Sequence, residues 1–205
     1  MTTSTPHAKL PAQERRSLTV RTAVRLAGEQ NPSDVTTAAI AEQMGLTQPA
    51  LFRHFPSKDA LWAGVMQWVA EQLLARVDRA AGGAASSPVA ALRATFEAHV
   101  DFIAHHPGVP RILLAELQRA DDTPAKRLVR TLLRRYRERI RGLVELGRER
   151  GEIARDIDPA AAATLFIGAI QGLVLSSLIS GGSAGLRADA PGAFAIVLRG
   201  IGGAP

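Results

Sequence analysis

The chain has 205 residues, of which 46% are hydrophobic and 4% are aromatic, and it contains no cysteine. This composition is typical of a helical globular protein of one or two domains, and it excludes wholesale disorder, a disulfide framework and a thiolate metal site. The net charge of +6 and the pI near 10.9 are compatible with a nucleic-acid partner.

Residues Met1 to Leu10 are polar and lack periodicity, and we expect a flexible arm there. The first predicted helix runs from Pro11 to Gln30, because apolar side chains recur at helical spacing along it. Asn31-Pro32 ends this helix, since the residue before a proline is driven toward an extended conformation. Basic residues outnumber acidic ones by only seven to five in residues 1 to 60, so this segment is not a basic block.

Residues Val35 to Trp62 predict two short helices joined by a tight turn. Thr36 or Thr37 can cap the first helix, and Gly45 suits a left-handed residue at its end. Thr47 is expected to cap the second helix, with Pro49 in its first turn. Such a unit with a polar second helix has the geometry that enters a DNA major groove. Amphipathic helix pairs of this kind are also common in helical proteins without DNA.

The same stretch resembles the N-terminal signature of the TetR family of transcriptional repressors, without a gap from residue 35 to residue 62. Phe52 stands where that family usually has a tyrosine. The resemblance implies an all-α fold with a helix-turn-helix head and a helical body that binds a ligand and dimerises, about nine helices in total. The expected DNA-binding residues are Thr36, Thr37, Thr47, Gln48, Pro49, Ala50, Phe52, Arg53, His54 and Lys58. We place the DNA-binding domain at residues 1–57 and the regulatory domain at residues 58–205.

A fourth helix is expected from Lys58 to about Ala81, followed by a linker at Gly82 to Ser87 and a helix that begins at Ser87-Pro88. His105 to Gly108 ends that helix, a short helix follows, and Thr123-Pro124 starts an arginine-rich helix that stops at Gly151. Six arginines of this helix share one face at helical spacing: Arg127, Arg130, Arg134, Arg137, Arg141 and Arg148. This face is either a solvated outer surface or a patch for DNA or another anionic partner.

The most apolar predicted helix follows Asp158-Pro159 and ends at Ser180, and a last helix is expected to start between Asp189 and Pro191. We expect no apolar run of the roughly 18 to 20 residues that a membrane span requires, and therefore a cytoplasmic protein. Small residues recur every four positions on the apolar helix and allow close approach of a second helix. The predicted homodimer interface comprises Thr164, Gly168, Gly172 and Ser176 with Phe194, Val197, Leu198 and Ile201.

Polar side chains among apolar ones are typical of small-molecule sites. By periodicity, the predicted ligand cavity is lined by Phe96, His99, Tyr136, Phe166 and Gln171. His99 is either a structural histidine or a polar anchor for this ligand. Asp101 and His105 are spaced one turn apart, but we interpret the histidines at this helix end as caps and predict no metal site and no cofactor.

We expect the protein not to be an enzyme. Gly181 to Gly185 satisfies the G-x-S-x-G pattern of a hydrolase nucleophile, but a helix rather than a strand precedes it, and the last histidine is His106. The predicted function is a dimeric repressor that binds a palindromic operator on double-stranded DNA and is released by a small-molecule effector. The alternative is an effector-independent, nucleoid-associated or architectural DNA-binding protein.

Overall fold

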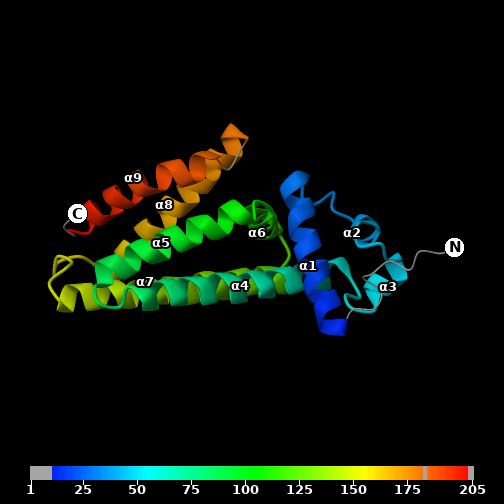
Figure 1. Ribbon diagram of the computed structural model, residues 1–205, viewed down its shortest axis with the longest axis horizontal. Coiled ribbons are helices and arrows are strands. Elements are labelled where there is room, and N and C mark those ends of the chain that lie inside the picture. The colour runs from blue at the N-terminus through cyan, green and yellow to red at the C-terminus, as the bar shows by residue number, and fades with distance from the viewer. Residues whose placement is uncertain (1–10, 182–183, 203–205) are drawn as a thin grey trace. The chain divides into compact units, whose positions relative to one another are not determined.

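The computed structural model describes residues 11–181 and 184–202, and the fold of these residues is all-α, as predicted (Figure 1). No strand occurs in this part of the chain. The described residues form nine helices: α1 (Ala12–Glu29), α2 (Thr37–Gln43), α3 (Gln48–Phe52), α4 (Lys58–Gly83), α5 (Pro88–His105), α6 (Gly108–Gln118), α7 (Pro124–Glu149), α8 (Pro159–Ser180) and α9 (Ala184–Gly200). The predicted arm at residues 1–10 lies outside the described residues.

The chain forms two compact units that are each built from two segments. The first unit comprises residues 1–70 and 106–130, and the second comprises residues 71–105 and 131–205. The units therefore divide within α4, whereas the predicted domain boundary lies before this helix. Helix α6 belongs with the N-terminal helices because it packs against α1, where the backbone of Gly108 comes close to those of Val24 and Gly28.

The core of the first unit is formed by one face of each of its helices. Val20, Ala23 and Val24 of α1 are buried, as are Leu51 beneath α3 and Phe55 just after it. Arg16 of α1 covers the edge of this core, with its guanidinium carbon 4.3 Å from the centre of the Phe55 ring. The short helices α2 and α3 pack against each other, and α2 also packs against α1.

The second unit has an aromatic centre contributed by three helices. Phe96 of α5 contacts Phe166 of α8 and Phe194 of α9, with ring centres 5.3 Å apart in both pairs. The turn after α7 is bonded to the start of α5, although the two lie far apart in the sequence. The Glu152 carboxylate accepts hydrogen bonds from the Ser87 hydroxyl at 2.6 Å and the Val89 N–H at 3.1 Å. A carboxylate suits this position because the first N–H groups of a helix lack partners and carry partial positive charge.

Helix α9 begins at Ala184, so the prediction that it starts between Asp189 and Pro191 is wrong. Pro191 lies inside the helix, where it lacks the N–H that would continue the hydrogen-bond ladder. Tertiary contacts offset that loss in the first turns: Leu186 is buried, and the Arg187 guanidinium pairs with Asp101 of α5 at 2.7 Å. The G-x-S-x-G pattern lies partly outside the described residues.

The expectation that no apolar run has the length of a membrane span is wrong for helix α8. It has 22 residues and a mean hydropathy of 1.9 over its most apolar window, so it passes that test by length and composition. One side of α8, including Phe166 and Ile170, packs into the second unit against α5 and α9. A core helix of this kind passes the same test, and one such helix is weak evidence for a membrane span.

Candidate nucleic-acid interface

The turn between α2 and α3 is built by backbone hydrogen bonds around one glycine. Thr36 caps α2 by accepting a hydrogen bond from the Ala39 N–H at 3.0 Å. At the other end, Gly45 has a φ of 62°, which confirms the predicted left-handed residue. The N–H of Leu46 donates to Ala41 at 2.8 Å and that of Gly45 donates to Glu42 at 2.9 Å. These are the two bonds of a Schellman cap, which fixes the direction in which the chain enters α3.

Helix α3 is short and rests on Leu51, with Pro49 in its first turn as predicted. Thr47 occupies the N-cap position, but its side chain accepts no capping hydrogen bond, so the prediction of a side-chain cap is wrong. The Thr47 carbonyl instead accepts from the Ala50 N–H at 3.0 Å. The Thr47 hydroxyl is therefore exposed rather than committed to the helix end.

The predicted DNA-binding side chains of α2 and α3 are exposed or half-buried. Thr36, Thr47, Gln48, Pro49 and Arg53 are exposed, and Phe52 is 39% exposed. Thr37, Ala50 and His54 are half-buried. The Gln48 amide donates a hydrogen bond to the Thr37 hydroxyl at 2.8 Å, and this bond links the starts of the two helices.

Arg16 supports the far end of α3, a role that the sequence did not indicate. Its guanidinium donates to the His54 carbonyl at 2.9 Å while it lies over Phe55. Burial lowers the pKa of the His54 imidazole, and the positive charges of Arg15, Arg16 and Arg53 lower it further. Because its pKa is lowered, His54 adds little positive charge at pH 7, and the cations at the end of α3 are Arg16 and Arg53.

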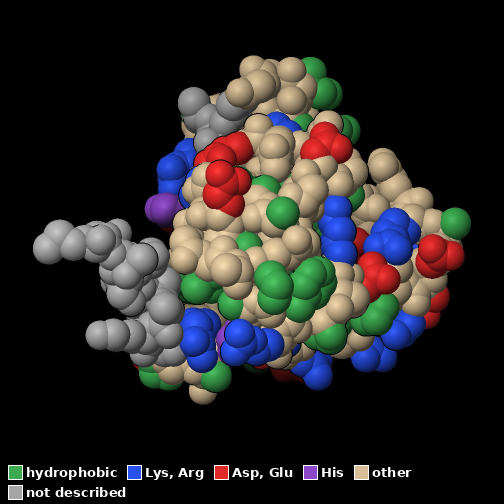
Figure 2. All heavy atoms as spheres, turned by 90° about the vertical axis from the view of Figure 1, so that its right-hand side faces the viewer, with side chains coloured by type: hydrophobic (Ala, Val, Ile, Leu, Met, Phe, Trp, Pro, Cys, Tyr) green, Lys and Arg blue, Asp and Glu red, His purple; other side chains and the backbone are tan. Residues whose placement is uncertain are grey.

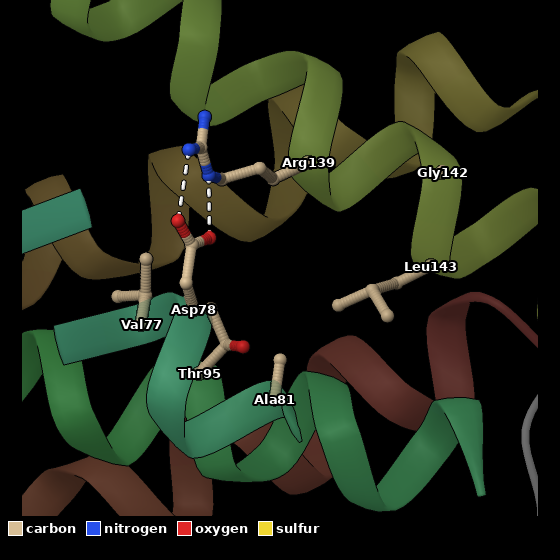
Figure 3. Close-up of a pocket in the computed structure, with 7 residues that line it drawn as sticks. All are labelled: Val77, Asp78, Ala81, Thr95, Arg139, Gly142 and Leu143. Atoms are coloured by element: carbon tan, nitrogen blue, oxygen red, sulfur yellow. Dashed lines mark hydrogen bonds and ion pairs between the residues drawn. The ribbon is translucent and has the colours of Figure 1, made fainter. Parts of the chain in front are cut away.

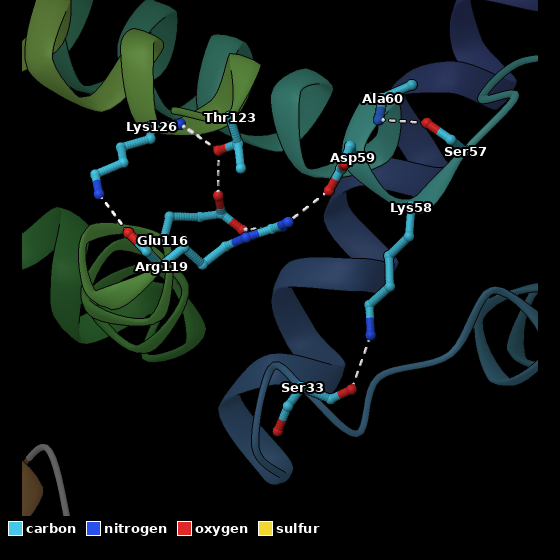
Figure 4. Close-up of polar contacts among 9 residues, drawn as sticks. All are labelled: Ser33, Ser57, Lys58, Asp59, Ala60, Glu116, Arg119, Thr123 and Lys126. Carbon is cyan, nitrogen blue, oxygen red and sulfur yellow. Dashed lines mark hydrogen bonds and ion pairs between the residues drawn. The ribbon is translucent and has the colours of Figure 1, made fainter. Parts of the chain in front are cut away.

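The first turn of α4 lies beside this surface and is held by polar contacts on both sides (Figure 4). The Ser57 hydroxyl caps α4 by accepting from the Ala60 N–H at 3.0 Å. Lys58 donates to the Ser33 carbonyl at 2.7 Å, so its ammonium group reaches back to the loop between α1 and α2. The Asp59 carboxylate accepts from Arg119 at 2.8 Å, which raises the pKa of that guanidinium.

Arg119 belongs to a network that sequence reasoning missed. The buried Glu116 carboxylate lies 3.6 Å from Arg119 and accepts a hydrogen bond from the Thr123 hydroxyl at 2.8 Å. Lys126 donates its backbone N–H to the same Thr123 oxygen and its ammonium group to the Arg119 carbonyl. The network therefore joins the start of α7 to α6, and α6 to the first turn of α4.

Basic side chains have acidic neighbours both on the surface shown in Figure 2 and along α7. The surface toward the viewer in Figure 2 carries basic and acidic side chains intermixed with apolar ones. Along α7, Arg127 and Arg130 pair with Asp122, and Arg141 lies between Glu138 and Glu145. These carboxylates partly neutralise the arginine face and support its interpretation as a solvated surface.

Four of the five predicted ligand-cavity residues lie together in the second unit. Phe96 and Phe166 are in contact, and His99 Nδ1 and the Tyr136 hydroxyl are hydrogen-bonded at 3.0 Å. Gln171 is exposed on α8, so it does not join this cluster within the chain. Its assignment rested on helical periodicity, which does not separate the two sides of a helix that is apolar all round.

The predicted dimer residues fall into two groups. Thr164, Gly168, Gly172 and Ser176 form an exposed stripe on α8. The prediction is wrong for the four residues of α9, because their side chains fill the core of the second unit and present no surface to another chain. These residues are Phe194, Val197, Leu198 and Ile201. Among the described side chains of α9, the exposed large apolar one is Ile196, which is 65% exposed.

The half-buried His99, which is hydrogen-bonded to the buried Tyr136, makes stability depend on pH. Burial lowers the pKa of His99 to about 4 from its ordinary 6.5, whereas the unfolded chain retains the ordinary value. The stabilisation from neutral His99 is thus fully present above pH 6.5 and is lost as the pH falls toward 4. We expect this residue to remove up to about 3 kcal/mol of unfolding free energy over that interval. Urea unfolding between pH 4 and 7 measures the loss.

The matched control for this prediction is His99→Gln, which keeps a hydrogen-bonding group near Tyr136 but does not titrate in this range. The variant should show a shallower pH dependence than the wild type between pH 6.5 and 4. Equal slopes for the two proteins would mean that His99 is protonated in the folded state as easily as in the unfolded one.

Comparison with known proteins gives the same assignment for both parts of the chain. Residues 20–65 match the family described as "Bacterial regulatory proteins, tetR family", and residues 85–175 match the family "Tetracyclin repressor-like, C-terminal domain". A TetR transcriptional regulator from Chloroflexus aurantiacus is 25% identical, with a TM-score of 0.75 over 92% of this chain and 96% of that one.

Two further relatives are informative. The Bacillus subtilis regulator FadR, solved in complex with stearoyl-CoA, has a TM-score of 0.78 at 18% identity over 90% of this chain and 98% of its own. The nucleoid occlusion factor SlmA of Vibrio cholerae is 24% identical over 147 residues, which are 72% of this chain and 74% of that protein.

Proposed function

Because this chain belongs to the TetR family, whose members are non-enzymatic DNA-binding transcriptional regulators, we propose that it is a repressor that binds a palindromic operator as a homodimer and is released by a small-molecule effector. Members of this family often dimerise and bind small ligands. A cytoplasmic location follows from this proposal, since the operator is chromosomal DNA.

One observation carries the proposal: α2 and α3, which are joined by a turn with a Schellman cap, expose polar side chains that can hydrogen-bond to DNA, among them Thr47, Gln48 and Arg53. Gln48 stands at the start of α3 and donates to Thr37, so its carboxamide is already oriented before DNA binds. A carboxamide both accepts from and donates to an adenine edge in the major groove. We assign Gln48 to base recognition, and Thr36, Thr37, Thr47 and Arg53 to contacts around it.

Lys58 is assigned to the DNA backbone. Its ammonium group bonds to the Ser33 carbonyl at the first turn of α4, where unpaired N–H groups and the helix dipole also favour a phosphate. Asp59 in the same turn would repel a phosphate, but its charge is neutralised by Arg119. Phe52 can contribute only an apolar contact, because it lacks a hydroxyl.

The proposed dimer interface is the outer side of α8 with that of α9. Beside the exposed stripe of small residues, four large apolar side chains of these helices are 47 to 79% exposed: Leu165, Leu175, Ile179 and Ile196. Exposed apolar groups on adjacent helices mark an interaction surface, and a two-fold axis would pair this surface with itself. The two heads would then read two half-sites of one palindrome.

Release by an effector requires that the ligand prefers a conformation in which the two heads do not match the operator. A change from nearly complete occupancy to nearly complete release needs a preference of about 10⁴-fold. Smaller preferences give a partial switch. Sequencing the genomic fragments retained by the purified protein tests the proposal, since a repressor of this kind retains a few fragments that share a palindrome.

Mutations of Gln48 and Lys58 should weaken DNA binding in different ways. Gln48→Ala should weaken operator binding by about 1 to 3 kcal/mol, with little effect on a scrambled duplex. Lys58→Ala should weaken both duplexes alike and reduce the slope of log affinity against log salt by about one. Binding titrations at several salt concentrations distinguish the two patterns, and thermal melts control for loss of the Ser33 contact.

If Gln48→Ala weakens the operator and the scrambled duplex equally, Gln48 contacts the backbone rather than a base. Arg134→Ala is a useful control, because Arg134 is an exposed cation of α7 outside the proposed interface. It should leave both affinities and the salt slope unchanged.

A second candidate function is favoured by the likeness to a nucleoid occlusion factor. In this alternative the protein binds many chromosomal sites without an effector, and the arginine face of α7 contributes. The ion pairs of Arg127, Arg130 and Arg141 weigh against that contribution. Discrete footprints that a ligand abolishes favour the repressor, whereas uniform DNA coating that depends on α7 favours the alternative.

A further inference from the structure

The second unit contains a cavity of about 250 Å³ that lies apart from the predicted ligand residues (Figure 3). It is bounded by the C-terminal part of α4, the middle of α5 and the middle of α7. Its lining residues are Val77, Asp78, Ala81, Thr95, Arg139, Gly142 and Leu143.

Thr95 is the unusual residue of this cavity. Its side chain is 2% exposed, and its hydroxyl oxygen has no hydrogen-bond partner. A buried threonine in a helix usually bonds to the carbonyl four residues earlier, as Thr19 does to Arg15 at 2.8 Å. An unpaired buried hydroxyl is costly and therefore marks a position where a ligand group completes the site.

The two charged residues at the cavity, Arg139 and Asp78, form an ion pair with each other. Arg139 donates to the two oxygens of Asp78 at 2.6 and 2.9 Å, and Figure 3 shows the pair above Thr95. The bond from Arg139 lowers the pKa of Asp78, so the carboxylate remains ionised. Because Asp78 and Arg139 already pair with each other and the remaining large side chains are apolar, a charged ligand would gain no unpaired counter-ion at this site.

We propose that this cavity binds a small, neutral, mostly apolar molecule with one hydrogen-bonding group that pairs with the Thr95 hydroxyl, and that this ligand is the effector. The proposal rests on the function proposed above and names the chemical class of its effector. The volume lies between the cavity of about 150 Å³ that holds benzene and the roughly 300 to 1,000 Å³ of larger ligand sites. It suits a phenol or a small bicyclic alcohol.

The cavity has a direct structural connection to α4. Val77, Asp78 and Ala81 lie in the last turns of α4, and Lys58 and Asp59 lie in the first turn of the same helix. A ligand that favours a different position of Asp78 relative to Arg139 would therefore act on the helix that begins beside the proposed phosphate contact. Such differential binding is what a ligand needs to shift a conformational equilibrium.

The experiment uses the full chain with phenol, toluene and benzoate. Each probe is a benzene ring with one substituent, which is a hydroxyl, a methyl or a carboxylate group. Binding is measured by calorimetry and by ligand-observed NMR. Phenol should bind at least about tenfold more tightly than benzoate. Thr95→Val, which removes only the hydroxyl, should weaken phenol about tenfold and leave toluene unchanged. Gly142→Leu, which adds a side chain at the lining, should weaken both.

Thr95→Val should fold normally and melt no lower than the wild type, because the hydroxyl it removes has no partner. Thr19→Val is the matched control, since it removes a buried hydroxyl outside the cavity and should leave phenol affinity unchanged. Phenol affinity that is the same in wild type, Thr95→Val and Gly142→Leu would overturn the proposal, and so would absence of phenol binding to a folded protein. Thr95-dependent binding that does not release DNA would support the site but contradict the effector role.

Discussion

Gly168→Leu is expected to convert the proposed dimer into monomers and to lower operator affinity by roughly 10²- to 10⁴-fold. Gly168 lies on the exposed stripe of α8, and an added Cβ would meet no atom of its own chain within 4 Å. The leucine therefore leaves the protomer intact but holds two α8 helices apart. The loss is large because a monomer has one head, and the second half-site no longer adds to binding.

Sedimentation velocity and a titration of operator DNA measure the two effects together. Gly82→Leu is the matched control: it is an exposed glycine of α4 that also has no atom within 4 Å of an added Cβ, and it lies outside α8 and α9. It should remain dimeric with unchanged DNA affinity. A dimer of unchanged affinity in Gly168→Leu would place the interface elsewhere.

Gly108→Ala should destabilise the first unit by about 3 kcal/mol or more. A Cβ at this position would lie 1.9 Å from the Val24 carbonyl oxygen and 2.8 Å from the Gly28 nitrogen. Both atoms belong to the backbone of α1, so neither can move without displacing that helix. Total unfolding free energies are about 5 to 15 kcal/mol, and the variant should thus lose a large fraction of its stability.

The expected observation is a lower urea midpoint together with weaker DNA binding, because α1 supports α3 through Arg16. Gly142→Ala is the control, since its added Cβ would meet no atom within 4 Å and a helical alanine is about 0.5 to 1 kcal/mol more favourable than glycine. If both variants unfold at the wild-type midpoint, α1 and α6 are not packed as closely as the structure has them.

Local interactions explain why the helices of the head could be predicted. The Thr36 cap, the left-handed Gly45 and the Ser57 cap each depend on atoms within about one helical turn. Residue type and spacing are sufficient to indicate such features. Thr47 shows the limit of this reasoning, because a threonine at an N-cap position still has a choice of rotamers.

The sequence by itself determined the all-α class, the family and the order of the helices, since each depends on periodicity, caps and one local motif. Only the tertiary structure decided which side of α9 is buried and where the cavity with Thr95 lies. It also decided that Arg119 neutralises Asp59, 60 residues away. The physical reason is that these features depend on the packing of distant helices, and helices such as α8 that are apolar all round carry no local signal of which side faces the core.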